Sequence, residues 1–270
     1  MAKYKIVFSD IDGTLLTNKH EVTLKTKEAV NKLKEINVPF VLVSARMPKG
    51  IYKVQKEINY DCPIVCYSGG LVIDASGKYI LSSGINIKIA YEVKQYIDSK
   101  WKDVSTSCYS YDEWIADDKK DKWIQQESYI TSVNPIEGNI LDICADTKVV
   151  HKILCMGEPE VIDGIKNSIT SKFTGLSIYK SKDTYLEIMD DRATKSNAMK
   201  VLCDMLNINM YESIALGDNY NDINMITAAG KGIAMGNAPL EVKNKSDEVT
   251  DSNNNDGAAK IIEKYFFEKN

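Results

Sequence analysis

The stretch "FSDIDGTLL", residues 8–16, decides the fold of this 270-residue chain. It begins as the end of an apolar, strand-like run and continues with two aspartates, Asp10 and Asp12, separated by one residue. Burying charge is costly, so two acids at the mouth of a buried strand require a physical reason. If the backbone stays extended here, both carboxylates point roughly the same way; Gly13 then allows a turn, which Thr14 can fix by a local hydrogen bond.

The chain on either side of this stretch alternates strand and helix patterns. Near-continuous apolar runs predict strands buried on both faces, and apolar residues at helical spacing predict the helices between them. Such alternation is typical of a parallel sheet covered by helices. The predicted strands cover 4–9, 38–43 and 64–66, and the predicted helices cover 23–36 and 48–58.

The last 80 residues resume this rhythm, whereas the middle of the chain is richer in Tyr, Ser and Lys. The C-terminal part predicts helices over 194–206, 221–229, 239–245 and 256–267, with strands over 213–216 and 232–235. The middle part predicts helices over 87–99, 119–129 and 159–172, with alternating strands over 149–156, 175–180 and 184–189. Alternation indicates a sheet with one exposed face.

These patterns predict an α/β fold with a doubly wound, Rossmann-like parallel-sheet core. Residues 1–83 and 190–270 would form that core, and residues 84–189 would form an inserted α+β cap domain.

Composition and charge exclude several classes of protein. The formal net charge of −4 argues against a surface built for nucleic acid. No apolar run approaches the ~20 residues that span a bilayer, and no signal peptide is evident. Six cysteines without a C-x-x-C pair, beside only two histidines, predict reduced core thiols rather than a zinc site. We therefore expect a cytoplasmic protein that binds neither membrane nor nucleic acid. Its oligomeric state does not follow from the sequence.

Polar residues follow several of the predicted strands. "SAR" at 44–46 follows the second strand, and "GDNYND" at 217–222 follows a strand near the C-terminus. Ligands of doubly wound sheets bind outside the carboxyl ends of the strands, so these residues and the two aspartates should meet there. Mg²⁺ prefers oxygen ligands, and proteins commonly bind it through a small number of carboxylates together with water and substrate phosphate. The sequence therefore predicts a divalent-cation site at this edge.

Two other interpretations of the first acidic pair are weaker. In a calcium loop starting at Asp10, the sixth position needs glycine, but Leu15 stands there, and a strand rather than a helix precedes it. A simple solvated turn leaves the second acidic cluster at 217–222 unexplained.

Four motifs resemble those of a known family. They are "DIDGT" at 10–14, "SAR" at 44–46, the lysine of "ATKSNAM" at Lys195, and "GDNYND" at 217–222. The chain resembles the haloacid dehalogenase-like phosphatases, in the large-cap (class IIB) branch called Cof-like. Its tail "GIAMGNAPLEVKNKSDEVTDSNNNDG", 232–257, is also similar to that branch.

The resemblance implies a role for each matching residue. Asp10 would be the nucleophile that forms an aspartyl-phosphate, and Asp12 would be the general acid and base. Mg²⁺ would bind to Asp10, the main-chain carbonyl of Asp12, and Asp218. The transferring phosphoryl group would be held by Ser44, Ala45, Lys195, Asn221 and backbone N–H groups around Ile11. Supporting roles would fall to Thr14, Arg46 and Asp222, with Asp222 orienting Lys195 or the water around the metal rather than binding it.

The chain departs from the branch at three places, one of which, Lys195-Ser196 in place of lysine and glycine, keeps the ammonium group. Ser44-Ala45 replaces a threonine and a glycine but keeps the hydroxyl, whereas Ser68 replaces an asparagine near the expected leaving group. None of these changes removes a group needed for phosphoryl transfer. The resulting hypothesis is a Mg²⁺-dependent phosphatase of small phosphorylated metabolites such as sugar phosphates. A phosphomutase using the same aspartyl-phosphate, and a non-catalytic protein that binds phosphorylated metabolites, are the alternatives.

Overall fold

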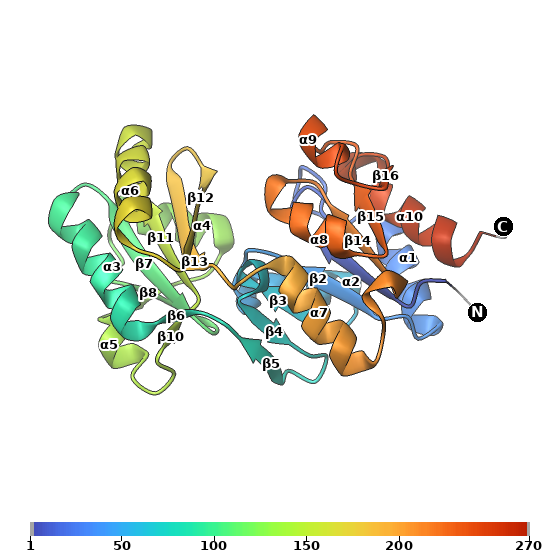
Figure 1. The fold of residues 1–270 in the computed structure, drawn as a ribbon, viewed down its shortest axis with the longest axis horizontal. Coiled ribbons are helices and arrows are strands. Elements are labelled where there is room, and N and C mark those ends of the chain that lie inside the picture. Colours follow the sequence, from blue (N-terminus) through green and yellow to red (C-terminus); the bar gives the residue numbers. More distant parts are fainter. Residues whose placement is uncertain (1–2, 269–270) are drawn as a thin grey trace. The chain divides into compact units, whose positions relative to one another are not determined.

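A computed structural model describes residues 3–268 of the chain. It divides into two compact units (Figure 1). Unit 1 comprises Met1–Arg46, Ile51–Leu81 and Thr194–Asn270, and unit 2 comprises Met47–Gly50 and Ser82–Ala193.

Unit 1 is built on one eight-stranded sheet of order β16-β15-β14-β1-β2-β3-β4-β5. Neighbouring strands from β16 to β3 pair in parallel, and β4 turns back antiparallel to β3. The strands are β1 (Ile6–Asp10), β2 (Phe40–Val43), β3 (Ile64–Cys66), β4 (Leu71–Ile73), β5 (Tyr79–Ser82), β14 (Ser213–Gly217), β15 (Lys231–Ala234) and β16 (Glu248–Val249). Every residue of β1, β2, β3 and β14 is buried, as their continuous apolar runs predict.

Helices cover both faces of this sheet (Figure 1). On one face, Met199 and Leu202 of α7 pack against Phe8 and Val41, together with Met225 of α8. On the other face α1 and α10 lie side by side, and Lys32 of α1 forms an ion pair with Glu263 of α10. The helices are α1 (Leu24–Glu35), α2 (Pro48–Ile58), α7 (Lys195–Leu206), α8 (Ile223–Ala228), α9 (Leu240–Lys243) and α10 (Gly257–Phe266). Short 3₁₀ turns, η1 (Tyr67–Gly69), η2 (Met210–Glu212), η3 (Tyr220–Asp222) and η4 (Asn253–Asn255), complete the unit. The predicted doubly wound α/β class is confirmed.

Unit 2 contains a six-stranded sheet of order β12-β13-β11-β7-β8-β9 and a two-stranded ribbon of β6 and β10. The strands are β6 (Ile85–Asn86), β7 (Ser105–Ser110), β8 (Glu113–Ala116), β9 (Ile136–Glu137), β10 (Val149–Val150), β11 (Lys152–Met156), β12 (Leu176–Lys182) and β13 (Tyr185–Asp190). The helices are α3 (Ile87–Lys100), α4 (Lys122–Thr131), α5 (Ile140–Ile143) and α6 (Pro159–Lys172).

The expectation of one exposed sheet face in unit 2 is wrong for its central strands. All residues of β11 and β13 are buried. One face packs on α3 and α6 through residues such as Ile97 and Ile162. On the other face Gln126 of α4 donates to the hydroxyl of Tyr185, a contact that alternation along one strand does not reveal.

The single strand predicted over 149–156 is interrupted at His151, and its two parts pair in different sheets. The buried imidazole explains the break. The backbone N–H of Tyr111 donates to its Nδ1 at 3.1 Å, so Nε2 carries the proton and donates to the hydroxyl of Ser82, also at 3.1 Å. The backbone N–H of His151 still donates to the carbonyl of Tyr109 at 2.8 Å, and the two side-chain hydrogen bonds hold the imidazole at the break.

We predict that His151 makes unit 2 less stable in mild acid. Burial lowers the pKa of His151 from 6.5 to about 4, so below pH 6.5 the unfolded chain binds a proton that the folded chain does not. The free energy of unfolding should therefore fall by about 2 kcal/mol between pH 7.5 and pH 5 because of this residue. All three tryptophans (Trp101, Trp114 and Trp123) lie in unit 2, so their fluorescence during urea unfolding measures this change.

His151→Gln should remove that part of the pH dependence. His20→Gln is the control for removing a histidine, because exposed His20 lies in unit 1, outside the unit on which the tryptophans report. If the free energy of unfolding changed equally with pH in the wild type and in His151→Gln, the buried imidazole would not be the titrating group.

None of the helices within residues 3–268 is both long enough and apolar enough to cross a membrane.

Candidate active site

The carboxyl ends of β1, β2 and β14 place the predicted site residues at one edge of the sheet of unit 1. Asp10 is the last residue of β1 and lies beside Val43, the last residue of β2. Ser44 follows directly, and Asp218 comes immediately after β14, which pairs with β1 on its other side. The predicted meeting of the two acidic clusters is confirmed, since Thr14 donates to Asp218 Oδ1 at 2.9 Å.

Lys195 joins the two clusters from the start of α7. Thr194 caps that helix, and the Lys195 side chain is fully buried. Its Nζ lies 2.5 Å from Asp10 Oδ1 and 2.5 Å from Asp222 Oδ1. Burial lowers the pKa of Lys195, but the two carboxylates raise it by more, so the pKa lies above its usual value and the lysine is a fixed cation.

Asp222 is fully buried, and both of its carboxylate oxygens are occupied by donors. Oδ1 accepts from Lys195, and Oδ2 accepts from the backbone N–H groups of Asp218 and Asn219 at 3.0 and 2.9 Å. The carboxylate thus fixes both the lysine and the turn that carries Asp218.

Asp10, Asp218 and Asp222 form a group of carboxylates whose oxygens lie within 4.8 Å of one another. Burial, followed by the negative charge of Asp222, raises the pKa of Asp10 well above its usual value. The pKa of Asp218 is raised to about 6, mainly by burial, while Thr14 lowers it and Asp222 raises it further. One buried lysine does not balance three carboxylates, so a divalent cation that prefers oxygen ligands fits this donor set.

Asp12 lies outside this group and faces Arg46 instead. Its carboxylate accepts two hydrogen bonds from the guanidinium, from Nε at 2.8 Å and from Nη2 at 2.5 Å. The Asp12 side chain is 46% exposed, whereas Asp10 is buried. The two aspartates that the sequence places together therefore have different environments: one is an enclosed carboxylate, and the other is held at the surface by an arginine. That contrast suits a nucleophile and a proton carrier.

The predicted phosphate-binding residues lie on the same edge. Ser44 is buried, and its hydroxyl accepts from the backbone N–H of Arg46 at 3.1 Å. Asn221 lies in η3, one residue before Asp222. Ile11 directly follows the end of β1, and Ala45 comes two residues after the end of β2. The carbonyl of Ile11 accepts from the backbone N–H groups of Leu15 and Leu16 as the chain turns.

Asn237, which lies outside the four motifs, also contacts the site. Its amide nitrogen lies 2.8 Å from the carbonyl oxygen of Gly13 and 3.4 Å from Asp218 Oδ2. Asn237 is the asparagine of "MGNA", in the C-terminal tail that resembles the family. The resemblance alone assigns this asparagine no chemical role.

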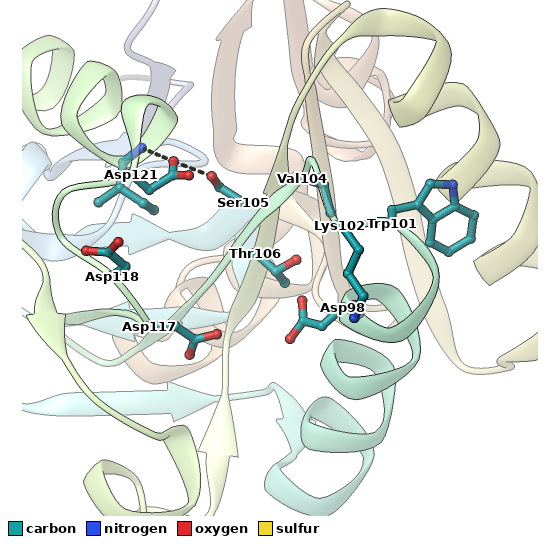
Figure 2. Close-up of a pocket in the computed structure, with 10 residues that line it drawn as sticks. Asp98, Trp101, Lys102, Val104, Ser105, Thr106, Asp117, Asp118 and Asp121 are labelled. Atoms are coloured by element: carbon teal, nitrogen blue, oxygen red, sulfur yellow. Dashed lines mark hydrogen bonds between the residues drawn. The ribbon is translucent and has the colours of Figure 1, made fainter.

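Unit 2 contains a separate acidic cavity of about 230 Å³. Figure 2 shows Asp121 in its wall, joined by hydrogen bonds to Ser105 and to the backbone of α4. Lys94 pairs with Asp98 at 2.6 Å and with Asp117. These acids are already partnered, and the metal-binding geometry found among residues 3–268 belongs to Asp10, Asp218 and Asp222 instead.

Comparisons with known proteins identify the family and the fold. The model of the haloacid dehalogenase-like hydrolases matches residues 7–262. A protein of Haemophilus influenzae named "putative phosphatase" is 37% identical over 263 residues, which cover 97% of this chain and 98% of that protein. A haloacid dehalogenase-like hydrolase of Bacteroides thetaiotaomicron superposes with a TM-score of 0.86 at 28% identity, covering 97% of this chain and 100% of that one.

A further structural neighbour shows the same fold at lower identity. The subclass IIB sugar phosphatase BT4131 is 22% identical, with a TM-score of 0.79 over 97% of this chain and 98% of that one. With the motifs gathered at one sheet edge and the family model spanning nearly the whole chain, the protein belongs to the haloacid dehalogenase-like hydrolases and is a phosphatase.

Proposed function

We propose that this phosphatase hydrolyses small phosphomonoesters with Mg²⁺ through a phosphorylated Asp10. The observation that carries the proposal is the buried Lys195, which lies 2.5 Å from both Asp10 and Asp222 beside a third carboxylate, Asp218. A nucleophilic carboxylate must approach a dianionic phosphate, and fixed positive charge is needed to overcome that repulsion.

Mg²⁺ would be held by the carboxylates of Asp10 and Asp218 and by the main-chain carbonyl of Asp12. When bound, it would supply positive charge to the non-bridging phosphate oxygens. Asp222 would stay outside this ligand set, because its oxygens already accept from Lys195 and from two backbone N–H groups.

In the first step an oxygen of Asp10 attacks phosphorus, and the bond from phosphorus to the ester oxygen breaks. Asp12, protonated at this stage, gives its proton to the departing alcohol oxygen. Lys195 and the hydroxyl of Ser44 hold the equatorial phosphate oxygens, with Asn221 and backbone N–H groups near Ile11 and Ala45. Phosphoryl transfer depends chiefly on such positioning and charge neutralisation.

In the second step Asp12 removes a proton from a water molecule, whose oxygen attacks phosphorus. The bond between Asp10 and phosphorus breaks, inorganic phosphate leaves, and Asp12 is again protonated. Arg46 supports the second step, because its two hydrogen bonds hold the ionised Asp12 carboxylate in one orientation while leaving it half exposed to water.

We further propose that residues 84–189, within unit 2, act as a cap that selects the leaving group, while unit 1 performs the chemistry. Small phosphorylated metabolites, including sugar phosphates, are the substrates we expect. The name of BT4131, a sugar phosphatase of the same fold, supports including sugar phosphates among them.

Phosphate release from a panel of phosphorylated metabolites, with Mg²⁺ and after chelation, tests the proposal. We expect turnover of several phosphomonoesters, its loss on chelation and its recovery on adding Mg²⁺. Turnover that is insensitive to chelation would refute the metal assignment. Conversion of a sugar phosphate to an isomer without phosphate release would indicate a phosphomutase, and binding without any conversion would indicate a non-catalytic protein.

A further inference from the structure

Two polar segments near the C-terminus hold the loop that follows Asp10 and carries Asp12. Asn237 belongs to the first segment, and Asn253 and Asn254 belong to the second. The two segments are tied together by the backbone N–H of Asn253, which donates to Asn237 Oδ1 at 3.0 Å.

Two backbone groups fix the orientation of the Asn237 amide. A backbone N–H can only donate, so the atom facing Asn253 must be the oxygen; a carbonyl can only accept, so the atom facing Gly13 must be the nitrogen. Rotating the amide by 180° would break both bonds. The amide nitrogen is therefore directed at Gly13 and at Asp218 Oδ2, which lies 3.4 Å away.

Three residues enclose the Asp218 carboxylate: Gly13 and Thr14 from the loop after β1, and Asn237. Thr14 donates to Oδ1, Asn237 approaches Oδ2, and Gly13 packs directly against the carboxylate. A Cβ on Gly13 would lie 2.3 Å from Oδ2, so only glycine permits this approach. Because Asn237 also binds the carbonyl of Gly13 at 2.8 Å, it fixes the surface on which Asp218 rests.

Asn253 holds the other side of the same loop. It is buried, and its amide nitrogen donates to the carbonyl of Leu16 at 2.8 Å and to Asn18 Oδ1 at 3.0 Å. The loop is thus held on both sides, at Gly13 by Asn237 and at Leu16 by Asn253.

We propose that Asn237 is a positioning residue for the metal site, with its amide orientation set by Asn253. It acts through Asp218 and Gly13 and does not touch the reacting atoms. The inference rests on the proposed function, because it assumes that Asp218 is a ligand of Mg²⁺. Groups that orient metal ligands typically contribute 10–100-fold to metal affinity.

Direct metal binding tests this role without measuring turnover. Mn²⁺ would serve as the probe, with the free ion quantified by its electron paramagnetic resonance signal. We expect Asn237→Ala to raise the Kd for Mn²⁺ by about 10- to 100-fold relative to the wild type. Asn237 is exposed, so the fold should survive; Asn237→Leu, which keeps most of the side-chain volume, should give the same shift.

Asn254→Ala is the matched control. Asn254 is also exposed and holds the same loop, since its Oδ1 accepts from the N–H of Asn18 at 2.9 Å, but it does not contact Asp218. The Kd of Asn254→Ala for Mn²⁺ should stay within about twofold of the wild-type value, because Asn254 makes no contact that orients the metal ligand Asp218. Equal Kd values for wild type and both Asn237 variants, or equal shifts in the control, would overturn the inference. Absence of any metal binding by the wild type would instead refute the proposed metal site.

Discussion

Asp10→Asn is expected to reduce kcat by at least about 10³-fold and to abolish phosphorylation of the protein. An amide is a poor nucleophile, and no other carboxylate lies at the end of β1 in the same enclosed position. The fold should be retained, because Asn has the same shape and Lys195 keeps its contact with Asp222. Steady-state turnover of para-nitrophenyl phosphate and acid-quenched labelling with radioactive substrate measure the two effects.

Asp12→Asn separates the nucleophile from the acid and base. This variant should also lose steady-state turnover, because it cannot activate water, but it keeps Asp10 and can therefore retain label after a good leaving group departs. Radioactive phosphate bound covalently to Asp10→Asn would disprove the assignment of the nucleophile.

Lys195→Met is expected to damage both catalysis and stability. Methionine fills much of the lysine volume but leaves Asp10 and Asp222 buried without their cation, a change that typically costs about 3–5 kcal/mol of unfolding free energy. Loss of a charged group that stabilises the transition state should reduce kcat by about 10²–10³-fold. Hydrogen exchange of the β1 amides reports the stability of unit 1, which contains no tryptophan.

Two further variants give this prediction its controls. Lys200→Met removes an exposed lysine from the same helix, where it pairs with Asp204, and should change stability by less than about 1 kcal/mol. Adding Asp222→Asn to Lys195→Met should recover part of the stability but none of the turnover, since it removes one unpaired charge. If Lys195→Met were as stable as Lys200→Met, the buried ion pairs would not stabilise the folded protein.

The fold of unit 1 could be predicted because its central strands are apolar except at their ends. The strands of unit 2 were harder to recognise. The run "STSCYS" at 105–110 forms a fully buried strand, yet four of its six residues carry an aliphatic hydroxyl, and hydroxyl-rich runs resemble loops. The break at His151 depends on hydrogen bonds to Ser82 and Tyr111, which are distant in sequence. Local patterns contain no information about such partners.

Part of the candidate site could likewise be predicted from the sequence, and part could not. Residues with charge at strand ends could be identified from type and spacing, because topology alone brings strand ends together. Side-chain geometry could not be identified in this way: the pairing of Asp12 with Arg46, and the use of both Asp222 oxygens by donors, depend on rotamers and burial. Asn237 was missed because an uncharged amide in a turn is common and its partner Gly13 lies 224 residues away.

The position of β1 between β14 and β2 has a consequence for the order of events during synthesis. The proposed nucleophile Asp10 is synthesised before its partners in the site: Lys195 follows it by 185 residues, and the bond from Thr14 to Asp218 spans 204. Contacts of such long separation form late, and domains generally fold as their residues become available. The nearly continuous stretch of unit 2 is complete before β14 exists. On the proposed mechanism, a nascent chain that lacks β14 lacks Asp218 and a complete metal site, and it should not hydrolyse phosphomonoesters.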